Sequence, residues 1–320
     1  MVTALLFDRD QVAEVDDWHE RLPRIRRSAI LWLDLAEPDD EQIRSLADEL
    51  ELTAESRDSL LSPGNVPRLA DHGSYLHLTA CGPSDPRERS LQGIACLVSE
   101  RWVVTVHDGP LQVLDTFRER ASGSGDTGEL DGLAFLANLL EWVVHSYFQA
   151  FEEIERSLEE IDTLAMQGQV SSHDNVLSRL VALRREIGEL RRALTSHREA
   201  LLALTRPELQ AIASSDSARR FDALRERLEE AAQAARDSRD AVVGSFDVLI
   251  ASTEQRTNDI VKILTLVSIL LLPGALIAGI LGMNFKLPLF DDVTNFWLVL
   301  AAIGAIAVGT LAVARMRDWI

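Results

Sequence analysis

Residues 263–284 read ILTLVSILLLPGALIAGILGMN, and this stretch decides the fold because it holds no charged side chain. A short polar loop follows at 286–292, and a second charge-free run begins at Val293. An α-helix needs about 20 mostly apolar residues to cross a bilayer. The two runs therefore predict two transmembrane helices at about 263–283 and 295–314, joined by an outer loop at 284–294.

The composition restricts the partners that the chain can have. Its 320 residues carry a formal net charge of −19, which suits neither nucleic acid nor an anionic lipid surface but attracts cations. Cys81 and Cys96 are its only thiols, and both lie in apolar surroundings. We therefore expect no disulfide framework, a reducing compartment and no cofactor.

The charges beside the two apolar runs predict the topology. Residues 1–8 lack a basic region and a long apolar core, so they predict a strand and no signal peptide. Basic residues precede the first run and follow the second, whereas the loop between the runs carries one Lys against two Asp. The positive-inside rule then places both termini in the cytoplasm of a protein of the cell inner or plasma membrane. The flanking basic residues are Arg256, Lys262, Arg315 and Arg317.

We expect three parts along the chain: an α/β domain at 1–128, a helical hairpin with a long stalk helix at 129–262, and a transmembrane domain at 263–320. The first part has short apolar or alternating runs near 29–35, 75–79, 93–98 and 102–106, which predict an antiparallel or mixed sheet. The fold class is thus an α+β cytoplasmic domain followed by stalk helices and two transmembrane helices.

The stalk begins with two helices of opposite charge. Residues 130–166 become acidic toward their end, and residues 173–204 are rich in Arg. This pattern predicts an antiparallel pair with facing charges, and it favours a solvated hairpin over a dedicated binding surface. A further helix begins near Ser217 and meets no Pro before Pro273.

A stripe of polar and small residues follows one face of this last helix. At spacings of three, four and seven residues, it changes from acidic to polar to small or apolar as the helix enters the bilayer. An ordinary coiled-coil seam is one interpretation, but carboxylates are poor occupants of a dry seam. A cation path between packed parallel copies fits better. The stripe comprises Asp247, Glu254, Asn258, Val261, Leu264, Ser268, Leu272, Ala275 and Gly282.

The same segment resembles the C-terminal signature of CorA-type magnesium channels. The matching residues are 257–265 (TNDIVKILT), Pro273 and 282–285 (GMNF). Residues 32–35 (WLDL) and 102–107 (WVVTVH) resemble the first half of that family. The resemblance covers nearly the whole chain, and it implies a funnel-shaped homopentamer in which the first transmembrane helix lines the pore.

The resemblance also assigns roles along the stripe. Gly282, Met283 and Asn284 would form the outer mouth, where a ring of Asn284 amides contacts Mg²⁺ through its hydration shell. Asn258 would form an inner polar ring, and Asp247 and Glu254 would concentrate cations. Apolar constrictions would lie at Val261, Leu264 and Leu272. The implied cargo is Mg²⁺, with Co²⁺ and Ni²⁺ also carried.

Two departures from the family's pattern matter. In the outer loop, Lys286 lies near the mouth, and the acidic residues are Asp291 and Asp292. On the stalk, Ala223 occupies the position where the family's magnesium-sensing sites carry an acidic residue. Asp222 is one residue early, which rotates a helical side chain by about 100°, and Glu226 is nearby. This puts a cytoplasmic regulatory site in doubt.

Two other functions stay open. A zinc transporter of the ZntB type, proton coupling included, is favoured by Ala223 but disfavoured by the GMN motif and by the lack of Cys or His after His197. A membrane-anchored sensor or scaffold would need neither an amide at a pore mouth nor a polar stripe. No catalytic residues are expected, because the candidates lack the spacing of ligands or nucleophiles and are interpreted as surface or strand-end residues. Those candidates are Asp34, Asp71, His72, His77 and His107.

Overall fold

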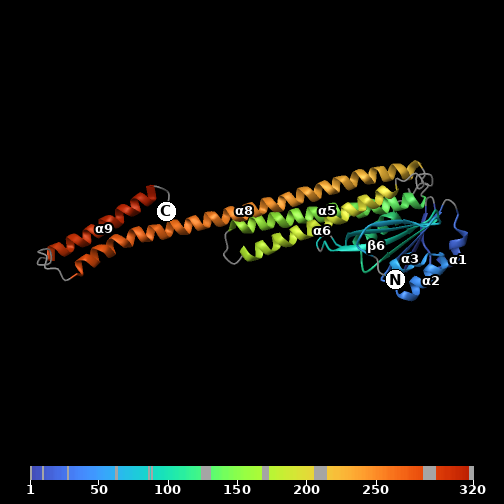
Figure 1. Cartoon of the computed structure of the whole chain (residues 1–320), viewed down its shortest axis with the longest axis horizontal. Helices are drawn as coiled ribbons and strands as arrows, with labels where there is room; N and C mark the ends of the chain where they lie inside the picture. The colour runs from blue at the N-terminus through green and yellow to red at the C-terminus, as the bar shows by residue number, and fades with distance from the viewer. Residues whose placement is uncertain are drawn as a thin grey trace. The chain divides into compact units, whose positions relative to one another are not determined.

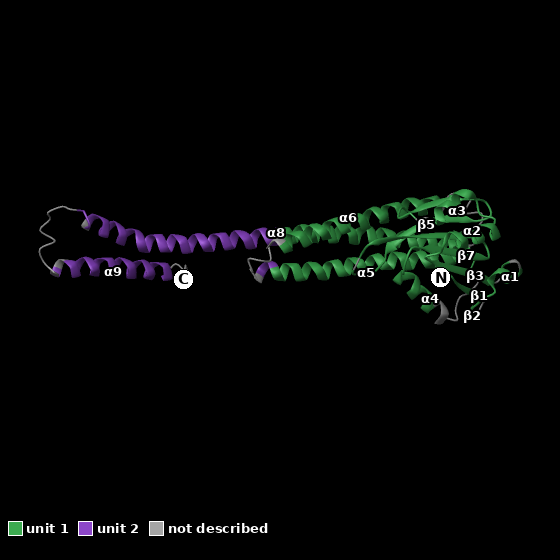
Figure 2. Ribbon diagram, turned by 90° about the horizontal axis from the view of Figure 1, so that it is seen from below, with its two compact units in different colours: residues 1–164, 171–246 green, residues 165–170, 247–320 purple. Residues whose placement is uncertain are grey.

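The computed structural model describes residues 2–8, 11–26, 29–61, 64–85, 87, 89–123, 131–167, 173–204, 215–283 and 293–316. The chain divides into two compact units (Figure 2). Unit 1 contains residues 1–164 and 171–246, and unit 2 contains residues 165–170 and 247–320. The predicted division at 128 and 262 stays a prediction.

Unit 1 is built on a seven-stranded sheet with the order β2-β1-β3-β7-β6-β5-β4. β3 and β7 are parallel and the other neighbours are antiparallel, so the expected mixed sheet is confirmed. The short edge strands β2 and β4 were not predicted. The strands are β1 (Val2–Asp8), β2 (Gln11–Glu14), β3 (Ala29–Ala36), β4 (Arg68–Asp71), β5 (Leu76–Pro83), β6 (Leu91–Val98) and β7 (Trp102–His107).

Short helices cover one face of the sheet. Asp39 accepts a hydrogen bond from Gln42 N at 2.8 Å and thereby begins α2 with a capping box. α2 and α3 bury Ile43, Leu46 and Leu60 against the strand residues Leu31, Leu33, Val104 and Val106. The short elements on this face are α1 (Trp18–Arg21), η1 (Leu22–Arg24), α2 (Asp40–Glu49) and α3 (Ala54–Leu60). The remaining short helix, α4 (Gln112–Gly123), lies on the opposite face, where Phe117 contacts Trp32.

The opposite face packs on the long helices through aromatic rings. Phe135 of α5 (Gly132–Gln167) lies 5.5 Å from Trp32 and 5.3 Å from Phe117 between ring centroids. Phe7 completes this group at 5.4 Å from Phe135. All four side chains are buried, and such edge-to-face contacts add about 0.5–1.5 kcal/mol each to the area that they bury. The aromatic group therefore fixes α5 to the sheet.

α5, α6 (His173–Leu204) and the first half of α8 (Ser215–Leu281) lie side by side within unit 1 (Figure 1). The charges of the two antiparallel helices contribute little to their contact. Arg179 and Glu160 form an ion pair of 3.3 Å between α5 and α6, but both side chains are exposed. The seam is instead apolar, with Ile154, Ile161, Leu180, Leu190, Leu228, Ala231 and Ala235 fully or nearly buried.

A buried polar network crosses the middle of the sheet. Trp32 Nε1 donates to Thr105 Oγ1 at 2.9 Å, and Thr105 Oγ1 donates to Asp34 Oδ1 at 2.5 Å. His107 Nε2 lies 3.4 Å from the same carboxylate, and Arg118 of α4 pairs with its other oxygen. Burial opposes ionisation of Asp34, but His107, Thr105 and Arg118 together hold its pKa below the usual value.

A second buried polar contact joins the sheet to α5 and α6. Cys81 N donates to His197 Nε2 at 3.3 Å, and the His197 Nδ1–H group donates to Ala193 O at 3.0 Å. Tyr147 of α5 donates to Cys81 O at 2.9 Å. Burial lowers the pKa of His197 to about 4, so the imidazole is neutral at pH 7.

We expect Asp34→Ala to destabilise unit 1 by about 3 kcal/mol, because the variant leaves His107 and Arg118 without their shared carboxylate. The matched control is Asp115→Ala, which removes an exposed partner of the same Arg118 and should cost less than about 1 kcal/mol. Urea unfolding of the full-length protein in detergent, followed by circular dichroism, measures both. Equal effects of the two variants would contradict the role of the buried network.

We also expect unit 1 to lose stability as the pH falls from about 6.5 toward about 4. The unfolded chain binds a proton at His197 in this window, whereas the folded pKa of about 4 keeps the buried ring neutral. His197→Gln retains an acceptor for Cys81 N and does not titrate. Hydrogen exchange of β5 and α6 peptides at pH 7 and pH 5 should therefore change less in the variant than in the parent, and an identical pH response would refute this assignment.

Candidate functional site

Two helices are long and apolar enough to cross a membrane. They are α8, whose apolar part is its second half, and α9 (Val293–Met316), in which Phe296–Met316 meets the criterion. None of the side chains in their most apolar windows is buried. A core helix of a soluble protein would be covered by its neighbours. Exposed apolar side chains on both helices, such as Leu271, Leu276 and Trp297, instead match a hydrocarbon environment.

Within unit 2, α8 contacts α9 through one face. A Cβ atom added to Gly274 would lie 3.5 Å from Ile303 Cγ2, so the missing side chain allows the two helices to approach. A gap of about 430 Å³ lies farther along, and its walls come from both helices. The walls are formed by Leu266, Ile269, Ile306, Gly309, Thr310, Val313 and Ala314.

The predicted pore-lining residues lie on another face of α8. Asp247, Glu254 and Asn258 are exposed in the single chain, and none of the stripe residues lines the gap between α8 and α9. Val261, Leu264 and Leu272 are also exposed, with 52%, 65% and 66% of their surfaces accessible. The structure therefore brings the stripe together on one helical face that α9 leaves uncovered.

Hydroxyl groups inside the apolar part of α8 bond to the helix itself. Ser268 Oγ donates to Leu264 O at 2.8 Å, and Thr265 Oγ1 donates to Val261 O at 2.7 Å. These bonds to carbonyls one turn earlier satisfy each donor without a partner from another segment. The Ser268 hydroxyl can still accept a hydrogen bond on the stripe, but its proton is already donated to Leu264 O.

α8 ends immediately before the predicted mouth. Gly282 N donates to Ala278 O at 2.9 Å, and the following Met283 N donates to Ile280 O at 3.3 Å, which tightens the last turn. A Cβ atom on Gly282 would lie 3.2 Å from Ala278 O, so a larger residue at this position would crowd the last turn of the helix. Asn284, Lys286, Asp291 and Asp292 lie outside the described residues.

The stalk position at which the family carries a magnesium-sensing acid has no carboxylate in this chain. Ala223 is exposed on α8, and Asp222 Oδ1 lies 3.4 Å from Arg225 Nη2 in an ion pair. Throughout the described ranges, no group of three or more His, Cys, Asp or Glu side chains could hold a metal ion.

Two polar residues of the sheet were interpreted wrongly from the sequence. Asp34 and His77 lie within β3 and β5 and are 2% and 6% exposed, so they belong to the core and not to the surface or a strand end. His107 is the last residue of β7, so it is the strand-end residue that was expected, although it is only 3% exposed. Ser56 Oγ lies 3.1 Å from His77 Nδ1 and 3.1 Å from His72 Nε2, and it accepts a hydrogen bond from Tyr75. Burial lowers the pKa of His77 to about 4. Each of these residues stands in or beside an apolar strand, and this sequence context could have indicated that it is buried.

Comparison with known proteins identifies the family of the chain. The family model for the CorA-like Mg2+ transporter protein matches residues 27–315. The cobalt/magnesium transport protein CorA of Methanocaldococcus jannaschii is 22% identical over 295 residues, which are 91% of this chain and 92% of that protein.

Solved structures agree on the fold. The complete structure of the CorA magnesium transporter from Methanocaldococcus jannaschii matches with a TM-score of 0.80 and 21% identity, covering 100% of this chain and 99% of that one. The cytoplasmic domain of ZntB from Vibrio parahaemolyticus matches with a TM-score of 0.61 and 12% identity, covering 79% of this chain and 98% of that one. Together with the two apolar helices, these findings establish a membrane protein. The chain belongs to the CorA-like Mg2+ transporter protein family.

Proposed function

We propose that this protein conducts Mg²⁺, and also Co²⁺ or Ni²⁺, across the plasma membrane along a pore lined by α8 of several copies. The observation that carries the proposal is the exposed face of α8 on which Asp247, Glu254 and Asn258 precede Val261, Leu264 and Leu272. This face lies apart from the contact with α9, so a second copy of the helix can cover it. The matching family description names Mg²⁺, and the relative from Methanocaldococcus jannaschii is named for cobalt and magnesium, which supports Mg²⁺ and Co²⁺ as the cargo.

The order of residues along this face suits a hydrated divalent cation. Carboxylates at Asp247 and Glu254 raise the local cation concentration, and they stand before the apolar segment, where charges are tolerated. The apolar positions that follow can close the path by expelling water. Mg²⁺ gives up its water reluctantly, so a ring of neutral Asn284 amides that hydrogen-bonds the hydration shell can select the ion without stripping it.

A single α8 helix cannot enclose a path, so the proposal requires an oligomer. We propose a homopentamer, on the strength of the family's resemblance. The helix of 67 residues carries both the unit 1 contacts and the stripe, so each copy would contribute one continuous wall. Arg256 and Lys262 before the apolar part and Arg315 after α9 support cytoplasmic termini, with membrane potential driving cation entry.

A zinc transporter of the ZntB type is the second candidate. The observation in its favour is the missing carboxylate at Ala223, where a magnesium-sensing site would carry one. The likeness to the ZntB cytoplasmic domain, at 12% identity, concerns the fold alone. Against this candidate, the exposed face of α8 offers oxygen ligands and no imidazole or thiol, which are the groups that Zn²⁺ prefers.

Asn284→Ala should abolish uptake of Mg²⁺ because the mouth loses the amides that hold the hydration shell. We expect a loss of roughly tenfold or more in the initial rate of dye-reported uptake into proteoliposomes. Asn175→Ala makes the same chemical change on an exposed position of α6 and should leave the rate unchanged. Full uptake by the Asn284 variant would show that the Asn284 amides are not needed for Mg²⁺ uptake.

The same vesicles separate the two candidate cargoes. Mg²⁺ entry that follows the membrane potential and leaves internal pH unchanged supports the channel. Preferential Zn²⁺ entry with acidification of the lumen supports the zinc transporter instead.

We also expect the flux to be insensitive to Mg²⁺ on the side of unit 1. Ala223 has no carboxylate, and the neighbouring Asp222 pairs with Arg225, so the position at which the family carries its sensing acid offers Mg²⁺ no ligand. In inside-out patches, millimolar Mg²⁺ on that side should change the current less than about twofold, far below the roughly 5- to 150-fold typical of allosteric coupling. Closure by an order of magnitude would show that sensing residues exist elsewhere.

A further inference from the structure

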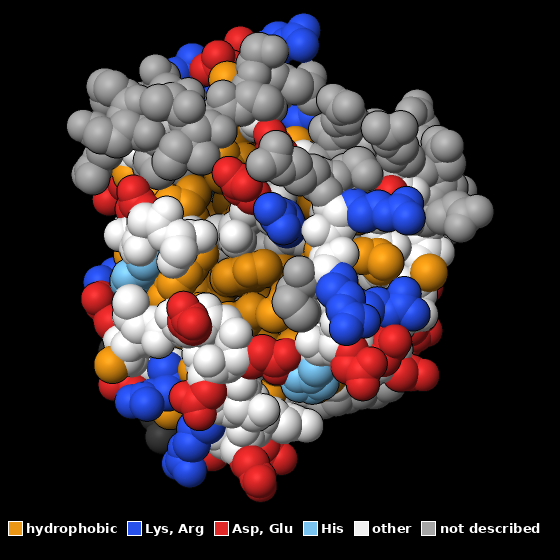
Figure 3. Space-filling view, turned by 90° about the vertical axis from the view of Figure 1, so that its right-hand side faces the viewer, with side chains coloured by type: hydrophobic (Ala, Val, Ile, Leu, Met, Phe, Trp, Pro, Cys, Tyr) orange, Lys and Arg blue, Asp and Glu red, His pale blue; other side chains and the backbone are white. Residues whose placement is uncertain are grey.

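A cavity of about 590 Å³ opens at one end of unit 1, where it has no part in the proposed pore. It lies where β5 begins, β6 ends and β7 begins, beside the first turn of α5. Figure 3 looks onto this end of the unit and shows a hollow with hydrophobic side chains in its floor and charged side chains around it. The volume is within the range of about 300–1,000 Å³ that small-molecule sites occupy.

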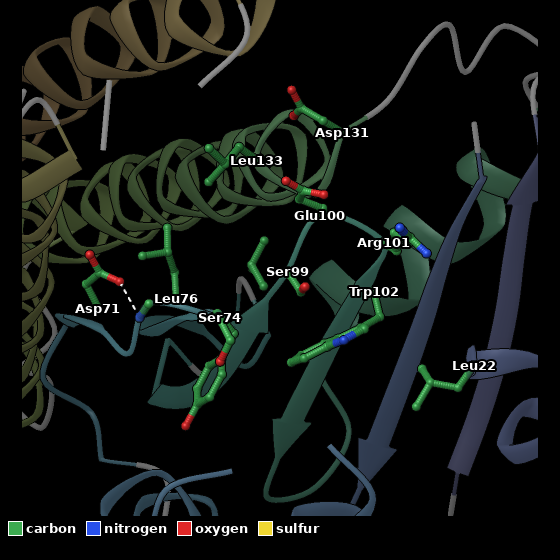
Figure 4. Close-up of a pocket in the computed structure, with 14 residues that line it drawn as sticks. Leu22, Asp71, Ser74, Leu76, Ser99, Glu100, Arg101, Trp102, Asp131 and Leu133 are labelled. Carbon is green, nitrogen blue, oxygen red and sulfur yellow. Dashed lines mark hydrogen bonds between the residues drawn. The ribbon is translucent and has the colours of Figure 1, made fainter. Parts of the chain in front are cut away.

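The floor of the cavity is a fixed aromatic surface. The rings of Trp102 and Tyr75 lie 6.1 Å apart between centroids, and Leu22 and Leu76 extend the apolar surface (Figure 4). Two hydrogen bonds of its hydroxyl fix the Tyr75 ring: the hydroxyl donates to Ser56 Oγ at 2.9 Å and accepts from Thr53 N at 3.0 Å. Trp102 is partly exposed, so a ligand can reach its ring.

The rim of the cavity is negatively charged. Among the described residues that line the cavity, the carboxylates are Asp71, Glu100 and Asp131 and the one cation is Arg101, which leaves two negative charges in excess. In Figure 4 the guanidinium of Arg101 is directed away from the carboxylate of Glu100. Glu100 is exposed and forms no ion pair with any residue in the described ranges.

An anionic ligand does not fit this cavity, although a helix N-terminus points toward it. Asp131 already occupies the end of α5, since its Oδ1 accepts from Ala134 N at 2.6 Å and its Oδ2 accepts from Ser217 Oγ at 3.0 Å. Gly132 is pressed so closely against Ser99 that an added Cβ atom would lie 1.9 Å from Ser99 O. A phosphate would meet a carboxylate there and find no room beside it.

A bare metal ion fits no better. The carboxylates of the rim belong to no group of three or more metal-ligating side chains among the described residues. Asp71 moreover uses Oδ1 to accept from Gly73 N at 2.8 Å. An aromatic floor supplies no ligand for a hard divalent cation.

We propose that this cavity binds a small organic cation: a primary ammonium group on an aromatic or branched apolar body. The ammonium would lie between Glu100 and the ring of Trp102, where a carboxylate and an aromatic face both attract a cation. The apolar body would cover Leu22 and the accessible part of Trp102, above the buried Tyr75 and Leu76. This assignment rests on Glu100 and Trp102, and it does not depend on the proposed transport function.

The test is isothermal titration of the full-length protein in nanodiscs with three probes of similar size. Phenethylammonium carries the charge, 2-phenylethanol is its neutral counterpart, and phenylacetate is its anionic counterpart. We expect the ammonium to bind roughly tenfold or more tightly than the alcohol, and the anion to bind weakest. Equal affinity for the ammonium and the alcohol, tighter binding of the anion, or no heat from the ammonium at millimolar concentration overturns the proposal.

Two pairs of variants locate the site. Glu100→Gln should weaken ammonium binding several-fold and leave alcohol binding unchanged, whereas Glu119→Gln, an equal loss of charge at an exposed position of α4, should alter neither. Trp102→Phe should keep the preference for the ammonium, whereas Trp102→Leu should lose most of it because the aromatic face is gone. Thermal melting of each variant verifies the fold, and unchanged ammonium binding by both Glu100→Gln and Trp102→Leu would refute the site.

Discussion

The bilayer imposes the constraint on which the rest of the molecule depends. In hydrocarbon, each backbone N–H and C=O group must find its partner within the protein, and a continuous helix achieves this with its own bonds. α8 meets this requirement over 67 residues, and its hydroxyl side chains bond to carbonyls of the same helix. Pro273 removes only one donor from this ladder. The helix can therefore carry side chains from the contacts of unit 1 into the membrane without a break.

A helix that satisfies its own backbone leaves its side chains free to differ from face to face. α8 uses small residues such as Gly274 to approach α9, and it places carboxylates, an amide and then aliphatic groups on a face that α9 does not cover. In water, an uncovered face with Leu264 and Leu272 would be costly, at about 25 cal/mol for each Å² of apolar surface. Within a membrane assembly, the same surface can meet lipid, a neighbouring helix or a narrow path for an ion.

The sequence predicted the five longer strands, the long helices and the membrane spans because each has a periodic or continuous apolar pattern, which the short edge strands β2 and β4 lack. It failed at Asp34 and His77, since a charged or polar side chain in an apolar strand has no local sign that its partner, such as Arg118, arrives from a distant helix. The cavity at Trp102 was missed for the same reason: its walls come from Leu22, Tyr75, Glu100 and Asp131, which only the fold brings together. The roles of Asn284 and the outer loop stay predictions, because these residues lie outside the described ranges.

The two proposed sites handle cations in opposite ways, and hydration explains the difference. A small divalent ion holds its water so strongly that carboxylates which displaced this water would either fail to bind the ion or fail to release it. Neutral amides such as Asn284 avoid both outcomes. An organic ammonium is weakly hydrated over its apolar body, so an aromatic floor at Trp102 and Tyr75 gains by covering it while Glu100 meets the charge. A strongly acidic chain thus attracts cations generally, and the side chains at each site determine which kind is bound.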